Sequence, residues 1–91
     1  MALVLGLEKG SSIYVGDTQV MLVEIYSPRR YKIRVCEPAM DREYEVSEQI
    51  RTEILPRVYV SAGDTGNMHM ARLAIEAPKE IVVLREKLYH R

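Results

Sequence analysis

One short stretch, PRRYKIR at residues 28–34, places cations and an aromatic ring close together. It contains Tyr31 and four cations: Arg29, Arg30, Lys32 and Arg34. Guanidinium and ammonium groups bind phosphate, and an aromatic ring stacks on an unpaired base, so the stretch is suited to single-stranded RNA. The alternative is an exposed strand edge, where Lys and Arg prevent aggregation between sheets. The sequence leaves both interpretations open.

The sequence gives weaker evidence for catalysis or metal binding than for RNA binding. Asp64-Thr65-Gly66 matches the Asp-Thr-Gly of dimeric aspartic proteases, in which two carboxylates share a proton and activate water. That motif directly follows an apolar strand, whereas Ser61-Ala62-Gly63 precedes it here, so a hairpin turn is the better interpretation. His69, His90 and Cys36 lack the spacing of metal ligands such as CxxC or HExxH. We therefore expect no enzyme activity, no metal and no cofactor.

Composition restricts the class of protein. The chain has 91 residues, enough for one domain, and 47% of them are hydrophobic. A core of this size is thin unless a second chain contributes to it, which predicts a homo-oligomer. Thirteen Lys and Arg balance thirteen Asp and Glu, so a polyanion would have to bind a local cluster of cations. One cysteine excludes an internal disulfide, and no stretch approaches the roughly 20 apolar residues of a membrane span, so we expect a cytoplasmic protein.

Alternation of apolar and polar residues predicts strands over most of the chain. The expected strands cover residues 2–7, 13–15, 20–25, 31–36, 58–60, 68–76 and 81–84. In residues 31–36, Tyr31, Ile33 and Val35 should face the core, and their neighbours should face solvent. Residues 20–25 are apolar on both faces for much of their length, with Val20 and Leu22 expected on one face and Met21, Val23 and Ile25 on the other.

Helix is expected at two places. In VSEQIRTEILP, residues 46–56, Ser47 can cap a helix, and Val46, Ile50 and Ile54 recur at four-residue steps before Pro56. These features predict an internal helix with Ile50 and Ile54 buried. A short C-terminal helix or frayed tail is expected over residues 85–91.

The chain also contains a weak internal similarity. KIRVCEPAMDREYEV, beginning at Lys32, resembles RLAIEAPKEIVVL, beginning at Arg72. A partial duplication would explain this similarity, and so would two strands that follow the same local rules.

Two terminal stretches carry a family resemblance. Residues 66–91, GNMHMARLAIEAPKEIVVLREKLYHR, combine a Gly-Asn turn, a strand ending in Ala-Pro-Lys-Glu, a short apolar strand and Arg-Glu. This pattern resembles the C-terminal half of the carbon storage regulator (CsrA/RsmA) family. The opening MALVLGLEKGSSIYVGD is similar to the family's first two strands. Residues 18–56 would then be an insertion, longer than the family's two-stranded middle, within a single domain of residues 1–91.

The resemblance implies a mainly β fold: a barrel-like homodimer of interleaved antiparallel strands, to which this chain would add the inserted helix and the C-terminal helix. In that family the first strand of one subunit lies beside the last strand of the other, and each end of the dimer binds a GGA motif of a messenger RNA leader or small RNA. Arg85, at the end of the last strand, could donate a bidentate pair of hydrogen bonds to guanine or phosphate. Carried over position by position, the expected RNA contacts are Val4, Leu5, Gly6, Leu7, Ala77, Pro78, Val83, Leu84 and Arg85.

One departure from the family leaves two functions open. The family's first strand usually ends in basic residues, whereas this chain has Leu7 and Glu8 there, which weakens the attraction for phosphate. The cations of residues 28–34 are the expected replacement, with Arg72 as a further candidate. The first function is an RNA-binding translational regulator, and the second is a divergent module that binds or sequesters a protein partner. Convergence of Arg85 with another cation favours RNA, and an edge dominated by Glu8 and Glu86 favours the protein partner.

Overall fold

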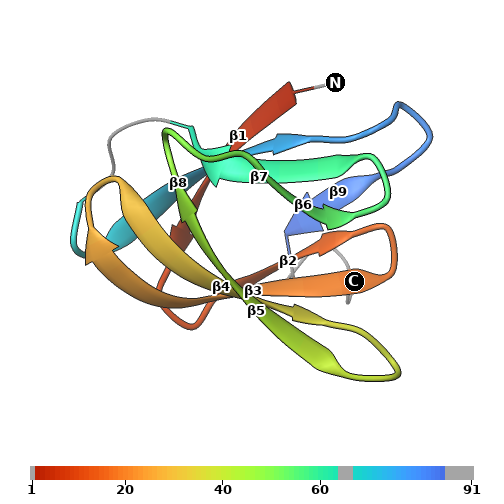
Figure 1. Cartoon of the computed structure of the whole chain (residues 1–91), viewed down its shortest axis with the longest axis horizontal. Coiled ribbons are helices and arrows are strands. Elements are labelled where there is room, and N and C mark those ends of the chain that lie inside the picture. The colour runs from red at the N-terminus through yellow and green to blue at the C-terminus, as the bar shows by residue number, and fades with distance from the viewer. Residues whose placement is uncertain (1, 64–66, 86–91) are drawn as a thin grey trace.

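The structure is a computed structural model that describes residues 2–63 and 67–85 (Figure 1). These residues form nine strands and no helix, and so contain no helix that could cross a membrane. The strands are β1 (Ala2–Glu8), β2 (Ser12–Val15), β3 (Thr18–Ser27), β4 (Arg30–Cys36), β5 (Asp41–Ser47), β6 (Thr52–Leu55), β7 (Val58–Ala62), β8 (Met70–Glu76) and β9 (Val83–Arg85). The prediction of a mainly β protein is confirmed. Of the C-terminal helix or tail expected over residues 85–91, Arg85 belongs to β9, and residues 86–91 lie outside the described residues.

The strands form two antiparallel sheets around one core. One sheet has the order β1-β8-β7-β6, and the other has the order β5-β4-β3-β2-β9. Both sheets contribute to the same buried cluster, for example through Leu73 of β8 and Leu22 of β3, each fully buried. Figure 1 shows the two sheets packed together, with β6 and β9 near the same end of the molecule.

Side-chain alternation decides which face of each strand is buried. Tyr31, Ile33 and Val35 are all fully buried on β4, as the sequence predicts. On β3 the pairing with β4 shifts register between Leu22 and Glu24, and this irregularity turns Ile25 into the core. The expectation that Ile25 faces away from Leu22 was therefore wrong, because a β-bulge interrupts the strict alternation of side chains between the two faces of a strand.

The predicted helix over residues 46–55 is absent, and two strands occupy the segment instead. Ser47 ends β5 rather than capping a helix, and Thr52 begins β6. β5 pairs with β4 along its whole length, from Asp41 opposite Cys36 to Ser47 opposite Arg30. A short isolated helix pays a high nucleation cost, whereas pairing with an existing strand satisfies the same backbone groups. Ile54 is buried as expected, but Ile50 lies in the link between the strands and is 61% exposed.

β1 finds its partner within its own chain. The sequence led us to expect that residues 2–7 would pair in a sheet shared between two chains. In the structure β1 pairs with β8 in an unbroken antiparallel ladder from Ala2 opposite Glu76 to Glu8 opposite Met70. This pairing within one chain contradicts the expectation that residues 2–7 pair with a second subunit, and the homodimer itself stays a prediction.

The fold contains an internal repeat of about 40 residues. The strands β2, β3 and β4 begin 40 residues before β6, β7 and β8, and β1 begins 39 residues before β5. Buried positions follow the same spacing, as with Ile33 and Leu73 and with Val35 and Ile75. Strands that merely obey the same local rules would not share spacing across four elements, so the internal similarity reflects two related units, β1–β4 and β5–β8.

Each unit contributes its first strand to the other. β1 of the first unit pairs with β8 of the second, and β5 of the second unit pairs with β4 of the first. The registers agree: Gly6 lies opposite Arg72, and the corresponding Glu45 lies opposite Lys32. This is the arrangement of a strand-exchanged dimer built from one chain. β9 stands outside the repeat and pairs with β2.

The corrected segment provides a test of the fold. Ile54→Asp should lower the free energy of unfolding by several kcal/mol, because it buries an unpaired carboxylate in the core. Ile50→Asp, four residues earlier and largely exposed, should change it by no more than about 0.5 kcal/mol. Urea denaturation measures both. Equal losses for the two variants would contradict the strand–link–strand assignment.

Candidate functional site

The candidate site lies where β1, at the edge of one sheet, meets β9, at the edge of the other. Arg85 lies opposite Ile13 of β2, at the end of β9. Its Nη1 donates a hydrogen bond of 2.8 Å to the backbone carbonyl of Gly6. The side chain of Arg85 therefore bridges the two sheets, between residues 79 positions apart in the chain.

A shallow hollow surrounds this contact. It has a volume of about 390 Å³ and is open to solvent. The residues that line it are Gly6, Leu7, Glu8, Ser11, Ser12, Met70 and Arg85. A second open hollow of about 510 Å³ shares Glu8 and Met70 with the first and continues to Asn67 and His69. An extended ligand could thus contact Arg85 and continue past the start of β8.

The predicted contacts on β1 divide between the two faces of the strand. Leu7 is only 3% exposed and belongs to the core, and Leu5 packs against the core. Val4 is 50% exposed on the opposite face. Gly6 shares the face of Val4, and a Cβ placed there would lie 2.9 Å from Sδ of Met70. Gly6 therefore allows Met70 to lie directly over the strand, beside Arg85.

The predicted contacts near β9 are mostly partly buried. Ala77 is 8% exposed and belongs to the core, while Pro78, Val83 and Leu84 are of intermediate exposure. Val83 and Leu84 pair with Val15 and Tyr14 of β2. These residues position the end of the strand, and Arg85 is the exposed side chain of β9.

Arg72 is the second cation at this place. It lies directly opposite Gly6 in the ladder between β1 and β8, and its side chain is exposed. Gly6 is thus the ladder partner of Arg72 and the hydrogen-bond acceptor of Arg85. Two of the cations expected from the sequence are therefore neighbours of one glycine, although Arg72 is not among the residues that line the hollow around Arg85.

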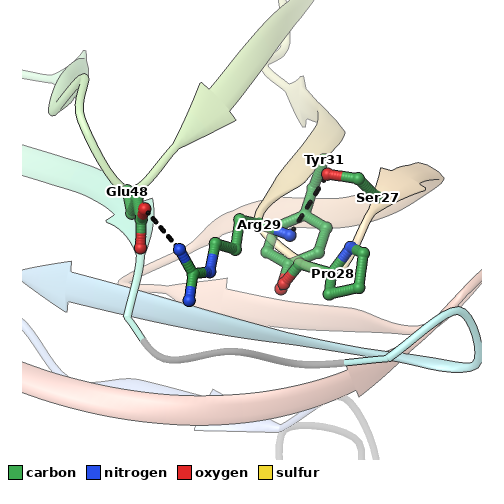
Figure 2. Close-up of polar contacts among 5 residues, drawn as sticks. All are labelled: Ser27, Pro28, Arg29, Tyr31 and Glu48. Carbon is green, nitrogen blue, oxygen red and sulfur yellow. Dashed lines mark hydrogen bonds and ion pairs between the residues drawn. The ribbon is translucent and has the colours of Figure 1, made fainter.

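The cations of residues 28–34 are engaged elsewhere. Nε of Arg30 donates to Glu45 at 2.6 Å, and Nη2 of Arg34 donates to Glu43 at 2.8 Å. Nζ of Lys32 lies 3.2 Å from the same Glu43. Figure 2 shows Arg29 reaching to Glu48, with an Nη1 to Oε1 distance of 3.1 Å. Each cation of this stretch therefore faces a carboxylate of β5 or of the residue that follows it, so the stretch is not an open basic surface.

Tyr31 is structural rather than a base-stacking platform. It is fully buried, and its hydroxyl donates to the carbonyl of Pro28 at 2.5 Å. The same hydroxyl accepts a hydrogen bond from the backbone N–H of Arg72 at 3.4 Å. Figure 2 shows the ring of Tyr31 next to Pro28 in the turn between β3 and β4. Of the two interpretations of residues 28–34, the structure favours solvated charged pairs over an RNA platform, but β4 is not a strand edge, because it lies between β3 and β5.

The pairing shifts the pKa values of the charged groups on this face. Hydrogen bonds from Arg34 and Lys32 lower the pKa of Glu43 below its ordinary value of 4.5. The hydrogen bond to Glu43 raises the pKa of Lys32 in turn. Each of these pKa shifts favours the charged form of its group. Because both side chains are accessible to solvent, the ion pair itself contributes little to the free energy of unfolding.

Most other described cations also face a carboxylate. Lys9 pairs with Glu24, Arg42 with Glu37, Arg51 with Glu76 and Arg57 with Glu80. Among residues 2–63 and 67–85, the Lys and Arg side chains that pair with no described carboxylate are Arg72, Lys79 and Arg85. Two of these three are neighbours of Gly6, whereas Glu8, which lines the same hollow, is the one described carboxylate there, so the candidate site keeps an excess of one positive charge.

Several residues of the site were not predicted from the sequence. Ser11, Ser12 and Met70 line the hollow, and the carbonyl of Gly6 holds Arg85. The Gly-Ser-Ser turn after β1 signals a loop but not its contact with the last strand. Glu8 also lines the hollow, as the protein-partner interpretation expected, whereas Glu86 lies outside the described residues.

The proposed metal ligands do not come together in the described part of the chain. No group of three or more His, Cys, Asp or Glu side chains there is arranged to hold a metal ion, and His90 lies outside it. Burial and the nearby Asp41 raise the pKa of the Cys36 thiol, which keeps it protonated. Residues 64–66, which carry the Asp-Thr-Gly motif, also lie outside the described residues.

Comparison of the chain with protein-family models, with curated proteins and with solved structures finds no match.

The charged ladder leads to a prediction about pH. The carboxyl of Glu43 should titrate below 4.5, and Arg34→Ala should raise its midpoint, because the largest cause of the lowered pKa is the hydrogen bond from Arg34. A carboxyl whose pKa is depressed on folding stabilises the fold above its unfolded pKa, and this contribution is lost as the pH falls through the folded value. NMR titration of the side-chain carboxyl carbons measures the midpoint. The same midpoint in wild type and variant would show that the ladder does not form in solution.

Proposed function

We propose that this protein binds single-stranded RNA at the junction of β1 and β9 and acts as a post-transcriptional regulator. The observation that carries the proposal is that Arg85 donates a hydrogen bond to Gly6 and Arg72 is the ladder partner of the same glycine, without a described carboxylate to pair with either. Because the chain has no net charge, a polyanion must bind where charge is locally unbalanced. This junction is such a place.

The geometry of Arg85 suits recognition of a base or phosphate. One guanidinium N–H is used by the carbonyl of Gly6, which fixes the direction of the group. Arginine carries five N–H donors in a planar fork, so donors remain for a guanine edge or a phosphate oxygen. A held guanidinium also loses less side-chain entropy on binding than a free one.

The surroundings of Arg85 provide the other contacts that an unpaired base needs. Ser11 and Ser12 bring hydroxyl groups to the hollow, although Oγ of Ser12 already accepts a hydrogen bond of 3.0 Å from Nε2 of Gln19. Met70 offers a flexible apolar surface beside Gly6. Single-stranded RNA is recognised through such combinations of apolar contact, hydrogen bonds to base edges and cations for phosphate.

The sequence preference rests on the family resemblance. The C-terminal match of residues 66–91 includes Pro78 and the strand that ends at Arg85, and the resemblance implies a GGA motif in a messenger RNA leader or small RNA. The paired cations of residues 28–34 are left out of the proposed site, because carboxylates already occupy their donors.

A protein partner is the second candidate. It is favoured by Glu8, whose carboxylate lines the hollow, and by the 50% exposure of Val4 on the same strand. A carboxylate repels phosphate, and an exposed apolar side chain is suited to a protein surface. RNA binding measurements distinguish the two candidates.

The central prediction concerns Arg85. Arg85→Ala should weaken binding of an RNA hairpin with a GGA loop by about 1–3 kcal/mol, because it removes the donors to guanine or phosphate. Arg85→Lys should restore only part of the loss, since an ammonium group cannot form the bidentate pair. Fluorescence anisotropy at two salt concentrations measures the affinity and its salt slope, and a hairpin with the loop changed from GGA to CCA measures the preference.

Two controls accompany this experiment. Arg30→Ala removes a cation that already pairs with Glu45, so it should change the affinity by no more than about twofold. Thermal unfolding should show that the Arg85 variants still fold. Normal RNA binding by folded Arg85→Ala, or no RNA binding by the wild type, would refute RNA recognition at this junction and leave the protein partner as the better candidate.

A further inference from the structure

We infer that one chain carries one RNA-binding end and acts as a one-site binder, because the two ends of its duplicated fold differ in strands and in charge. This inference rests on the proposed function. The first end is the junction of β1 and β9 at Gly6. The second end is the corresponding place one repeat later, where β5 borders one sheet and β6 borders the other.

The repeat identifies which residues correspond. Glu45 of β5 corresponds to Gly6 of β1, because the two residues occupy the same rung of matching ladders. In these rungs Glu45 faces Lys32, and Gly6 faces Arg72. At this rung the second end therefore has the carboxylate of Glu45, whereas the first end has a glycine without a side chain. The cation opposite is retained in both.

The second end also lacks the strand that carries Arg85. β9 pairs with β2 at the first end, whereas β6, the counterpart of β2, has only β7 as a partner among the described strands. Loop length explains the difference. The four residues between β4 and β5 close a hairpin, with the N–H of Glu37 bonded to the carbonyl of Met40, so β5 folds back onto β4. The six residues between β8 and β9, which include Pro78, allow β9 to cross to the other sheet.

The two ends also differ in the pairing of their charged side chains. Glu45 binds Arg30, and Glu43 binds both Lys32 and Arg34, so the cations near the second end are neutralised. A phosphate placed there would have to displace these carboxylates and would meet them at close range. At the first end Arg72 and Arg85 pair with no described carboxylate, and Glu8 is the one described acidic residue that lines the hollow.

A binder with one site differs in behaviour from one with two. A protein with two equivalent sites holds two motifs of the same RNA at once, and the second contact benefits from a high effective concentration that raises the affinity by about 10²–10⁴-fold. A chain with one site gains no such advantage. It would occupy single motifs independently and would not loop the RNA between them.

Stoichiometry and avidity test the inference. The full-length chain is titrated with an RNA that has one GGA hairpin and with an RNA that has two, joined by a flexible linker long enough to span the molecule. Native mass spectrometry and sedimentation count the chains and RNAs in each complex, and anisotropy measures the affinities. We expect one hairpin per chain, two chains on the two-hairpin RNA, and affinities per hairpin that agree within about twofold once the number of sites is counted.

Matched substitutions locate the site at one end. Arg72→Ala should weaken binding about tenfold, and Lys32→Ala, at the corresponding rung of the second end, should leave it unchanged within about twofold. Two hairpins per chain, a gain of tenfold or more with the two-hairpin RNA, or equal losses from the two substitutions would overturn the inference while leaving RNA binding intact. Absence of binding to either RNA would overturn the proposed function and the inference with it.

Discussion

The structure depends on the exchange of first strands between its two repeated units. β1 completes the sheet of the second unit, and β5 completes the sheet of the first, in the same register. In each unit, the strand that pairs with the last strand on its outer side comes from the other unit. The exchange also places a single buried cluster between the sheets, with residues from both units. A chain of 91 residues thereby obtains a shared core of the kind that two separate small subunits would otherwise form.

The candidate site follows from this exchange. Gly6 lies on the exchanged strand β1. Arg85 lies on β9, which follows the second unit in the chain and pairs with β2 of the first unit. Their hydrogen bond therefore joins parts of the chain that meet only when both units are folded. A site built on strand backbones rather than on a loop is held by the ladders on either side, which favours a fixed direction for the guanidinium. The site depends directly on the fold, because β1 provides both the ladder partner of Arg72 and the carbonyl that accepts the hydrogen bond from Arg85.

The sequence predicted what depends on local pattern and missed what depends on distant pairing. Tyr31, Ile33 and Val35 were placed correctly, since strand alternation alone decides their side. Val46 and Ile54 are both buried, as the helical spacing required, but they belong to two separate strands, each paired in a hairpin with its neighbour in the chain. A four-residue spacing does not show where one strand ends and the next begins. The contact between Arg85 and Gly6 spans almost the whole chain, so no local pattern could identify the acceptor.

Charge pairing explains why the most basic stretch is not the candidate site. The acidic residues Asp41, Glu43 and Glu45 alternate on β5, and Lys32 and Arg34 alternate on β4. Once β5 lies beside β4, Glu45 stands opposite Lys32 and Glu43 stands opposite Arg34. Opposite charges on facing strands stabilise the pairing and its register, and they remove the local field that an RNA would encounter. A cluster of cations in a sequence therefore indicates polyanion binding only when the neighbouring strand does not supply the carboxylates. In this chain that condition holds at Gly6, where the exchanged strand brings a glycine instead of a glutamate.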